Sequence, residues 1–417
     1  MVNRERLLRR FLHYVRVDTT AIEGAACYPS SPGQLQLGSM LVDELRAMGL
    51  SEVTHSEHGI VIATLPARGI DAAPVVAFNA HLDTSPETTG ADVKAQVIDN
   101  YSGGDIALPG DASKIIRVSE NPELNDLHGC TLITTDGTTL LGGDDKAGLA
   151  VIMEMAESLL ENESISHGPI RLLFTCDEEI GHGIDHVDIE ELAATACYTL
   201  DGGGAGDIDY ETFSADLAIV TVNGINIHPS IAKDKMVNAI RAAAAFVDEL
   251  PRHTLAPETT DGREGFIHPY QIEGGVAKVT LKIILRDFET EALADYAKLL
   301  RDIGVRVEAK YPGTTVSVET RRQYRNMREG LIHEPRAVRF AQVAHERLGR
   351  EAHLTIVRGG TDGSQLTERG LPTPNLSTGQ HNPHSPLEWA CLGEMIQATE
   401  VLIELVQVWA ENRPIDD

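Results

Sequence analysis

Two adjacent glutamates, Glu178 and Glu179, are the residues of this chain whose type and spacing best suit chemistry. They follow an apolar run at 170–175 that predicts a β-strand. Because neighbouring side chains point in different directions, one carboxylate could bind a metal ion while the other moves a proton. Acidic pairs on loops are common and mostly solvated, so the pair indicates a catalytic site only if other segments supply further ligands.

Other segments do offer possible metal ligands, most of them at the end of a predicted strand. His81 and Asp83 follow the apolar run at 74–80, and Asp201 follows the run at 196–200. Asp144 stands just before a predicted helix, and His384 lies near the C-terminus, where His381 is a rival to it. Open α/β sheets bind ligands at the carboxyl ends of their strands, so these side chains are expected to converge.

The ligand types fit zinc, because imidazoles and carboxylates without a thiolate form a mixed nitrogen and oxygen set. Manganese or cobalt would also suit such a set, and the number of carboxylates favours two ions rather than one. Each residue has an ordinary explanation by itself. His81 and His384 could be packed or surface histidines, Asp83 a solvated residue, Asp201 a turn residue and Asp144 a helix N-cap. Their joint occurrence favours the two-metal site.

Composition excludes some classes of partner. The 417 residues include 35 basic and 63 acidic side chains, a formal charge of −28, which argues against nucleic acid and anionic membranes. No apolar run reaches the roughly 18 residues of a spanning helix. The five cysteines are scattered and form no C-x-x-C pair, so we expect reduced thiols in a cytoplasmic protein. The Arg-rich segment 1–16 predicts a first helix of the fold rather than a transit peptide.

The elements that must position these residues fall into two patterns. Strands expected at 60–65, 74–80, 131–134, 171–175 and 196–200 alternate with helices at 34–48 and 147–161, which predicts an α/β layer with a mostly parallel sheet. After the glycine-rich break at 202–206, the strands at 217–222, 265–272, 276–285 and 314–319 and the helices at 237–250 and 291–303 follow the order of a ferredoxin-like α+β module. We therefore expect a catalytic domain over 1–213 and 325–417, closed by a helix at 392–412, with an inserted domain over 214–324.

Several motifs together resemble the peptidase T family. The family consists of tripeptide aminopeptidases among the dizinc exopeptidases that include acetylornithine deacetylase and carboxypeptidase G. The matching segments are NAHLDT (79–84), TDGTTLLGGDDKAG (135–148), DEEIG (177–181), VNGINIHP (222–229), GREG (262–265), LRDF (285–288) and RGGTDGS (358–364). The resemblance covers nearly the whole chain.

The resemblance implies a role for each matched residue. Asp144 would bridge two zinc ions, with His81 and Asp201 completing one site and Glu179 and His384 the other. Asp83 would hydrogen-bond the far nitrogen of His81, and the peptide after Asp144 would be cis. Glu178 would be the general base for a water molecule whose pKa the two ions lower. His384 is preferred to His381 because Glu388 follows it by four residues as in the family.

The resemblance also implies roles for the inserted domain and for a homodimer formed through it. His228 from the partner subunit would stabilise the developing oxyanion. Arg286, and with less support Arg358, would bind the carboxylate of the peptide. His228 could instead be a turn histidine, and Arg286 could belong to an ion pair at a strand edge. Gly143, Cys176 and Ser385-Pro386 depart from the family pattern but leave the ligand set intact.

Three functions remain open. The first is an aminopeptidase that releases the N-terminal residue of tripeptides. The second is another dizinc amidohydrolase, a deacylase or a dipeptidase, on the same scaffold. The third is a non-catalytic protein that binds metal or peptide. The ligand set with Glu178 argues against the third, and the match within the inserted domain favours the first over the second.

Overall fold

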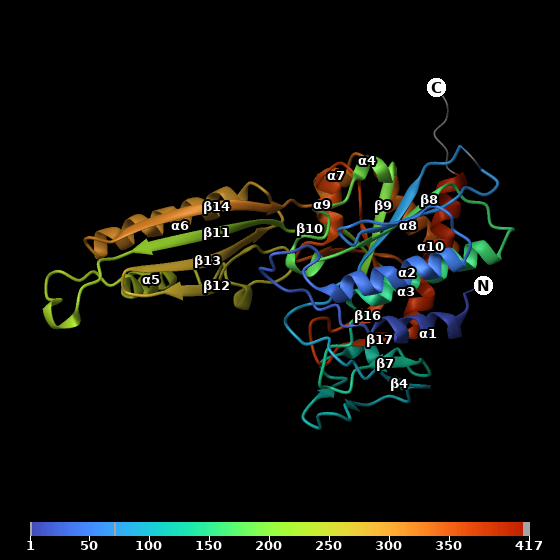
Figure 1. Ribbon diagram of the computed structural model, residues 1–417, viewed down its shortest axis with the longest axis horizontal. Helices are drawn as coiled ribbons and strands as arrows, with labels where there is room; N and C mark the ends of the chain where they lie inside the picture. The colour runs from blue at the N-terminus through green and yellow to red at the C-terminus, as the bar shows by residue number, and fades with distance from the viewer. Residues whose placement is uncertain (1, 71, 412–417) are drawn as a thin grey trace. The chain divides into compact units, whose positions relative to one another are not determined.

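The computed structural model describes residues 2–70 and 72–411, which form two compact units (Figure 1). The first unit takes in the described part of Met1–Tyr210, Gly330–Thr355 and Thr361–Asp417. The second takes in Glu211–Glu329 and the short return segment Ile356–Gly360. The segment expected as an insertion, 214–324, falls within the second unit, whereas the return segment has no signal in the sequence pattern.

The first unit is built on one large mixed sheet, with strand order β1-β2-β8-β3-β9-β16-β17-β7-β4; in addition, β10 pairs with β16, and β15 pairs with β10. Its strands are β1 (Val53–His55), β2 (Val61–Leu65), β3 (Val76–His81), β4 (Gln96–Ile98), β7 (Leu132–Thr134), β8 (Ile170–Thr175), β9 (Ala196–Gly203), β10 (Asp207–Thr212), β15 (His353–Val357), β16 (Asn375–His381) and β17 (Trp389–Cys391). A separate pair, β5 (Ile106–Ala107) with β6 (Ile115–Ile116), lies in the irregular region before β7.

Only the centre of this sheet is parallel, which corrects the expectation of a mostly parallel sheet. The strands β8, β3, β9 and β16 pair in parallel, and the strands on both sides of them pair antiparallel. Parallel pairing needs a crossover of a dozen or more residues. The chain supplies such crossovers between the central strands, whereas the connection from β1 to β2 is too short and makes a hairpin.

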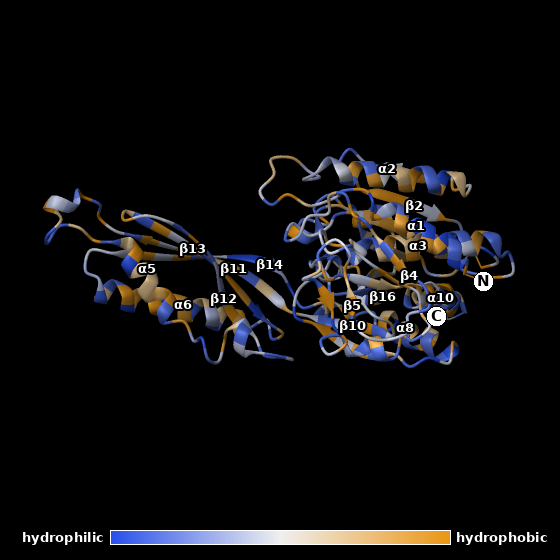
Figure 2. Cartoon of the chain, turned by 90° about the horizontal axis from the view of Figure 1, so that it is seen from below, coloured by the Kyte–Doolittle hydropathy of each residue, from blue (hydrophilic) through white to orange (hydrophobic). Residues whose placement is uncertain are grey.

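Helices cover the sheet of the first unit. They are α1 (Arg4–Tyr14), α2 (Pro32–Ala47), α3 (Gly143–Glu161), α4 (Ile189–Leu192), α7 (Arg328–Leu331, at the boundary of the two units), α8 (Arg336–Arg347), α9 (Asp362–Glu368) and α10 (Leu392–Glu411), with the 3-10 turns η1 (Pro122–Asn125) and η2 (Glu178–Ile180). The last helix ends at Glu411, and residue 412 of the expected helix lies outside the described residues. Figure 2 shows hydrophilic and hydrophobic residues alternating along α2, as expected for a helix with one face on a sheet.

The helix α3 is buried almost all round, although the sequence predicts one apolar face. It packs against β3 and β9 on one side and against α1 and α10 on the other. This arrangement also buries a charged residue, Glu154, whose exposed fraction is 0%. Arg6 donates to Glu154 from Nε at 2.7 Å and Arg10 from Nη1 at 2.9 Å, so α1 is bonded to α3 by charges within the interface.

We expect Glu154→Ala to lower the free energy of unfolding by about 3–5 kcal/mol, the usual cost of removing one partner of a buried ion pair. The carboxylate also accepts from the backbone amide of Asn3 at 2.9 Å and from the hydroxyl of Ser158 at 3.2 Å, so donors of four residues lose this acceptor at once. Urea denaturation followed by circular dichroism at a fixed metal concentration measures the change. Glu161→Ala is the matched control, since this residue also binds Arg6 but its side chain is 56% exposed, and it should cost at most about 1 kcal/mol. Equal losses in the two variants would contradict the prediction.

The second unit is a four-stranded antiparallel sheet with two helices. Its strands are β11 (Ser214–Asn223), β12 (Phe266–Gly274), β13 (Lys278–Asp287) and β14 (Thr315–Tyr324), in the order β12-β13-β11-β14, and its helices are α5 (Ala239–Asp248) and α6 (Ala292–Lys310), with the 3-10 turns η3 (Pro229–Ile231) and η4 (Pro257–Thr259). This element order and strand order are those of a ferredoxin-like module. The helices pack on each other and on β11 and β13. Between them lies a core that includes Val220, Phe246 and Leu300.

Two further findings concern the cysteines and the hydropathy of the helices. All five cysteines are free thiols, and Cys176, Cys197 and Cys391 are buried. Among the described residues, no helix combines the length and the apolar character needed to cross a bilayer.

Candidate metal centre

Five side chains of the first unit form two groups that could each hold a metal ion. One group is His81, Asp144 and Asp201, and the other is Asp144, Glu179 and His384. Within each group the candidate ligand atoms lie within 4.8 Å of one another. Asp144 belongs to both groups, which is the arrangement that a carboxylate bridging two ions requires. The structure therefore brings together all five residues expected to bind metal.

Parallel strands deliver two of these residues to the same edge of the sheet. His81 is the last residue of β3 and is paired with Thr175, the last residue of β8. On the other side of β3, Asn79 is paired with Thr199 of β9, and Asp201 follows two residues later within β9. The carboxyl ends of the central strands thus place an imidazole and a carboxylate together. Asp201 is a strand residue, so its explanation as a turn residue is wrong.

Asp144 is presented by a break at the start of α3. The Asp144–Asp145 peptide is cis, and both residues have non-helical backbone angles. The side chain of Asp145 accepts from the amide of Gly148 at 3.1 Å and from the amide of His81 at 3.1 Å. Asp145 thus makes the hydrogen bond expected of an N-cap residue. The alternative of Asp144 as the N-cap is therefore wrong, and the Asp144 carboxylate is available to the site.

Glu388 holds the loop that carries Asp144. Its buried carboxylate accepts from the backbone amides of Leu141 at 2.7 Å, Gly142 at 2.8 Å and Asp144 at 3.0 Å. Burial raises the pKa of Glu388 to about 7, although these amide donors act to lower it. Glu388, four positions after His384, therefore fixes the backbone at Asp144, the residue shared by the two candidate groups.

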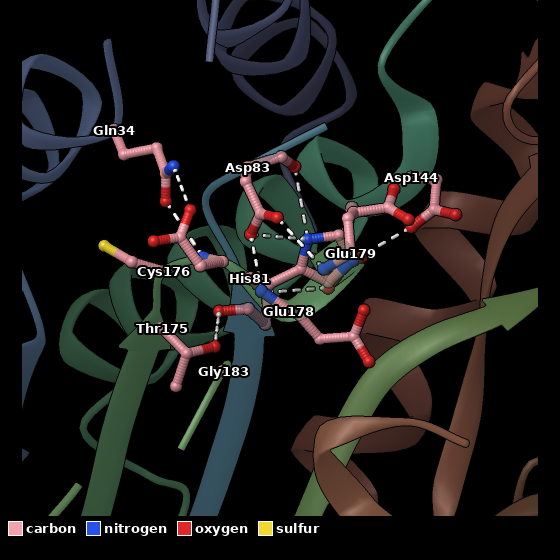
Figure 3. Close-up of polar contacts among 12 residues, drawn as sticks. Gln34, His81, Asp83, Asp144, Thr175, Cys176, Glu178, Glu179 and Gly183 are labelled. Atoms are coloured by element: carbon pink, nitrogen blue, oxygen red, sulfur yellow. Dashed lines mark hydrogen bonds and ion pairs between the residues drawn. The ribbon is translucent and has the colours of Figure 1, made fainter. Parts of the chain in front are cut away.

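The 3-10 turn η2, which carries Glu178 and Glu179, is held by the carboxylate of Asp83, which is fully buried. Its Oδ1 accepts from the amide of Glu178 at 3.1 Å and its Oδ2 from the amide of Glu179 at 3.0 Å (Figure 3). The same Oδ1 lies 3.4 Å from Nδ1 of His81, and that nitrogen also lies 3.2 Å from the backbone oxygen of Asp83. One residue thus contacts a candidate ligand and both glutamates.

A second clamp holds the turn from the side of α2. Asp177 is buried and has a φ of 61°, in the left-handed region that few residues other than glycine adopt. Its amide donates to Oε1 of Gln34 at 3.0 Å, and Nε2 of Gln34 donates back to Oδ1 of Asp177 at 2.6 Å. The amide of Ser30 donates to the other carboxylate oxygen at 2.6 Å. This network, drawn in part in Figure 3, fixes the backbone directly before Glu178.

His81 and His384, one from each candidate group, both lie close to the carboxylate of Asp144. Nε2 of His81 lies 3.0 Å from Oδ1 of Asp144 and 3.6 Å from Oδ1 of Asp201. Nε2 of His384 lies 3.3 Å from Oδ2 of Asp144 and 2.9 Å from Oε2 of Glu179. The other oxygen of Glu179, Oε1, is buried and has no hydrogen-bond partner among the described residues. A buried carboxylate oxygen without a hydrogen-bond partner is suited to bind a cation.

Burial and mutual repulsion raise the pKa of carboxylates in this site. Burial raises the pKa of Glu179 to about 8 and that of Asp201 to about 7, and the charge of Asp144 adds to both shifts. For His384, burial acts to lower the pKa, but the carboxylates of Asp144 and Glu179 raise it to about 11. A bound divalent cation would relieve this repulsion, because it supplies positive charge to all the carboxylates at once.

Glu178 differs from its neighbour. It belongs to neither group of candidate ligands, and no described side chain hydrogen-bonds to its carboxylate. Burial raises the pKa of Glu178 well above its usual range, with the nearby carboxylate of Asp201 as a further cause. A carboxylate close to the ligands, free of other bonds and with a raised pKa has the properties of a proton acceptor.

His381, the rival of His384, belongs to neither candidate group. Its ring stacks on Trp389 with centroids 3.7 Å apart, and its Nε2 lies 2.7 Å from Oε2 of Glu394. His384, with a φ of 60°, instead turns its ring toward Asp144 and Glu179. The structure therefore favours His384 as the ligand.

Three of the residues expected to act belong to the second unit. His228 lies on an exposed loop, where its Nδ1 is 2.7 Å from the hydroxyl of Ser230. Arg286 is on β13, an inner strand of its sheet, and donates from Nη1 to Gln323 at 3.0 Å. It is not in an ion pair at a strand edge, so that alternative is wrong.

Arg358, in the return segment, has its guanidinium bonded inside the second unit. It donates to the backbone oxygens of Gly262 at 2.9 Å and Glu264 at 2.8 Å, and it lies over the rings of Phe213 and Phe266. These contacts hold the return segment to the neighbouring strands of the same unit.

Sequence reasoning identified Asp83 but missed three other residues that support the site. Asp177 and Glu388 each had a signal, because one directly precedes the glutamate pair and the other follows His384 by four residues. Gln34 had none, since a glutamine on an amphipathic helix is ordinary and only the fold brings it to Asp177.

Comparison with known proteins gives consistent similarities. The model of the family described as peptidase family M20/M25/M40 matches residues 142–408, more than half of the chain. A protein named Peptidase T, from Geobacillus thermodenitrificans (strain NG80-2), is 43% identical over 409 residues, which cover 98% of this chain and 99% of that protein.

Two solved structures also resemble the chain over its length. The crystal structure of aminopeptidase PepT from Bacillus cereus has a TM-score of 0.75 at 25% identity and covers 98% of this chain and 99% of its own. That of a tripeptidase from Staphylococcus aureus has a TM-score of 0.78 at 23% identity and covers 99% and 100%. The second of these likenesses bears on the fold alone.

Proposed function

Because this chain belongs to peptidase family M20/M25/M40 and is a metallo-aminopeptidase, we propose that it releases the N-terminal residue of tripeptides. The observation that carries the proposal is the pair of ligand groups that share Asp144, next to a glutamate, Glu178, that belongs to neither. The resemblance to peptidase T extends through the second unit as well as the first, which supports a tripeptide over an acylated amino acid.

We propose two zinc ions as the cofactor, with manganese and cobalt as ions that the same ligands accept. The ligands would be the five residues of the two groups, His81, Asp144, Glu179, Asp201 and His384. When bound, two such ions supply the Lewis acidity that polarises a peptide carbonyl and makes a water molecule easier to deprotonate.

The residues of the chain divide the remaining work. Glu178 takes the proton of the attacking water and passes it to the amine that leaves. Asp83 keeps the imidazole of His81 and the backbone of Glu178 in place, as its contacts with both support. For the charge that develops on the carbonyl oxygen, we propose His228 from the second subunit of a homodimer formed through the inserted unit.

Recognition of the peptide carboxylate falls to an arginine of the second unit. Arg286 has one nitrogen bonded to Gln323 and Leu285, so much of its guanidinium is available for a carboxylate. Arg358 is committed to four oxygen acceptors in its own unit. We therefore propose Arg286 for this role and a supporting role for Arg358. The charge of −28 and the scattered cysteines support a cytoplasmic enzyme that binds neither nucleic acid nor membranes.

A substrate panel tests the proposal against its alternative, a deacylase or dipeptidase on the same scaffold. We expect Ala-Gly-Gly to be hydrolysed faster than Ala-Gly, a tetrapeptide or N-acetylalanine, because the proposed arginine binds the carboxylate of a peptide whose first bond lies at the metal centre. Release of the first residue is followed by chromatography with zinc, manganese or cobalt added. Dialysis against a chelator should abolish the activity, and re-addition of the metal should restore it. Preference for N-acetylalanine would show the alternative to be right.

A further inference from the structure

A cleft of about 580 Å³ opens beside the candidate metal ligands in the first unit, with Asp144 and Asp201 in its wall. The rest of the wall comes from segments far apart in the sequence, among them the turn that carries Glu123 and the end of β16. The mechanism proposed above uses only the two ligands of this wall. The rest of the cleft has no assigned role.

The wall of the cleft is strongly acidic. Its carboxylates are those of Glu123, Asp144, Asp201, Asp207, Asp209 and Glu394, and no lysine or arginine is among the described residues that line it. A cleft lined by one sign of charge attracts ligands of the opposite sign. A peptide carboxylate would be repelled here, so the cationic end of a peptide is the end that fits.

Asp207 and Asp209 serve the structure, and Glu123 and Glu394 are placed for a ligand. Asp207 lies 3.3 Å from Nδ1 of His353. Asp209 is buried and accepts from Thr355 at 2.7 Å and from Asn375 at 2.9 Å, so its oxygens are satisfied. Glu394 lies 2.7 Å from Nε2 of His381, and Glu123 lies 3.6 Å from Nδ1 of the same ring. The ring is itself held against Trp389. His381 thus separates two carboxylates and fixes one of them by a hydrogen bond.

A neutral side chain in the same wall independently requires a donor. Gln380 is 3% exposed, and its Nε2 donates to the backbone oxygen of Asp201 at 3.1 Å. Because a carbonyl oxygen can only accept, this bond fixes which end of the amide is nitrogen. The remaining oxygen, Oε1, is buried and has no partner among the described residues. A buried acceptor left open in the wall of a cleft calls for an N–H donor.

We propose that this cleft binds the ammonium group of the N-terminal residue of the peptide, through Glu123, Glu394 and the open oxygen of Gln380. The inference rests on the proposed function and adds to it the means by which a free amino terminus is selected. An ammonium group offers three donors and one positive charge, which match an acceptor flanked by carboxylates. The ammonium could be the α-amine or that of a lysine side chain, since both have the same chemistry.

Paired substrates that differ only in the amine test the proposal. Ala-Gly-Gly and propionyl-Gly-Gly differ in the α-amine, and Lys-Gly-Gly and norleucyl-Gly-Gly differ in the side-chain amine. In Glu394→Gln and Glu123→Gln we expect kcat/KM for the amine-bearing member of a pair to fall about tenfold or more, the effect of losing a charge-assisted hydrogen bond. In the pair that varies the bound amine, the member without that amine should be unchanged. Glu120→Gln, an exposed glutamate on the same segment that does not line the cleft, is the matched control.

The pattern of losses assigns the source of the ammonium. A loss that differs between the members of the first pair identifies the α-amine, and Lys-Gly-Gly and norleucyl-Gly-Gly, which both carry that amine, then lose activity equally. A loss that differs between the members of the second pair identifies the side-chain amine, and Ala-Gly-Gly and propionyl-Gly-Gly are then unchanged. Equal losses for both members of each pair, or the same loss in the Glu120→Gln control, would overturn the proposal. Metal content measured by mass spectrometry should be the same in all variants, because none of them is a candidate ligand.

Failure of the proposed function would look different. If the wild type hydrolysed N-acetylalanine and not Ala-Gly-Gly, the tripeptidase proposal would fall, and the cleft could still be tested with propylamine as a competitive inhibitor of that hydrolysis. Inhibition that weakens about tenfold or more in Glu394→Gln but not in Glu120→Gln would support an ammonium site. Inhibition that is the same in both variants would overturn it.

Discussion

Replacing Glu178 by glutamine is expected to lower kcat by at least about 10²–10⁴-fold while both metal ions stay bound. Glutamine keeps the size of the side chain and the backbone amide that donates to Asp83, but it cannot take a proton from water. The structure supports the retention of metal, because Glu178 belongs to neither group of candidate ligands. Steady-state kinetics and metal analysis after dialysis measure the two effects separately.

The neighbouring residue is the matched control for that variant. Glu179→Gln should lose metal, since Glu179 lies 2.9 Å from Nε2 of His384 within the second ligand group and its other oxygen is open. We expect about one ion per chain to remain after dialysis. If Glu178→Gln lost an ion and Glu179→Gln kept two, the roles of the two glutamates would be exchanged and the reaction class would stand.

Replacing Asp144 by asparagine should weaken both metal sites at once. Its carboxylate is shared by the two groups, with Oδ1 3.0 Å from Nε2 of His81 and Oδ2 3.3 Å from Nε2 of His384. Loss of its charge therefore reduces the attraction for both ions. We expect metal affinity to fall by more than the about 10–100-fold that a change outside the ligand set costs, with turnover lost at low metal concentration.

Asp201→Asn distinguishes a bridging role from that of an ordinary ligand. Asp201 belongs to one group only, so this variant should lose one ion of two in a titration followed by calorimetry. Asp126→Asn, which changes an exposed aspartate that belongs to neither candidate group, should behave as wild type. Two intact sites of normal affinity in Asp144→Asn would contradict the bridging role.

Sequence patterns predicted the ligands better than they predicted the supports of the ligands. Ligand residues follow apolar runs, and a run predicts where its strand ends, so His81 and Asp201 could be located to within a few residues. Glu178 and Glu179 could not be told apart in this way, because their different surroundings arise only in three dimensions.

The misses have two physical causes. Antiparallel pairing at the edges of the large sheet comes mostly from strands of three residues, such as β4 and β17, which are too short to show a period. Glu154 appeared as one polar residue of an amphipathic helix, because nothing local reveals that Arg6 and Arg10 of another helix cover it. Long-range contacts of this kind are absent from any window of sequence.

The buried carboxylate of Asp83 has a consequence for precision. It contacts the ring of His81 and the amides of both glutamates, so a thermal displacement of Asp83 shifts a ligand and the proton acceptor in the same direction. A displacement common to two groups cancels in the distance between them. We therefore expect the separation between the ring of His81 and the backbone of Glu178 to vary less than the position of either residue.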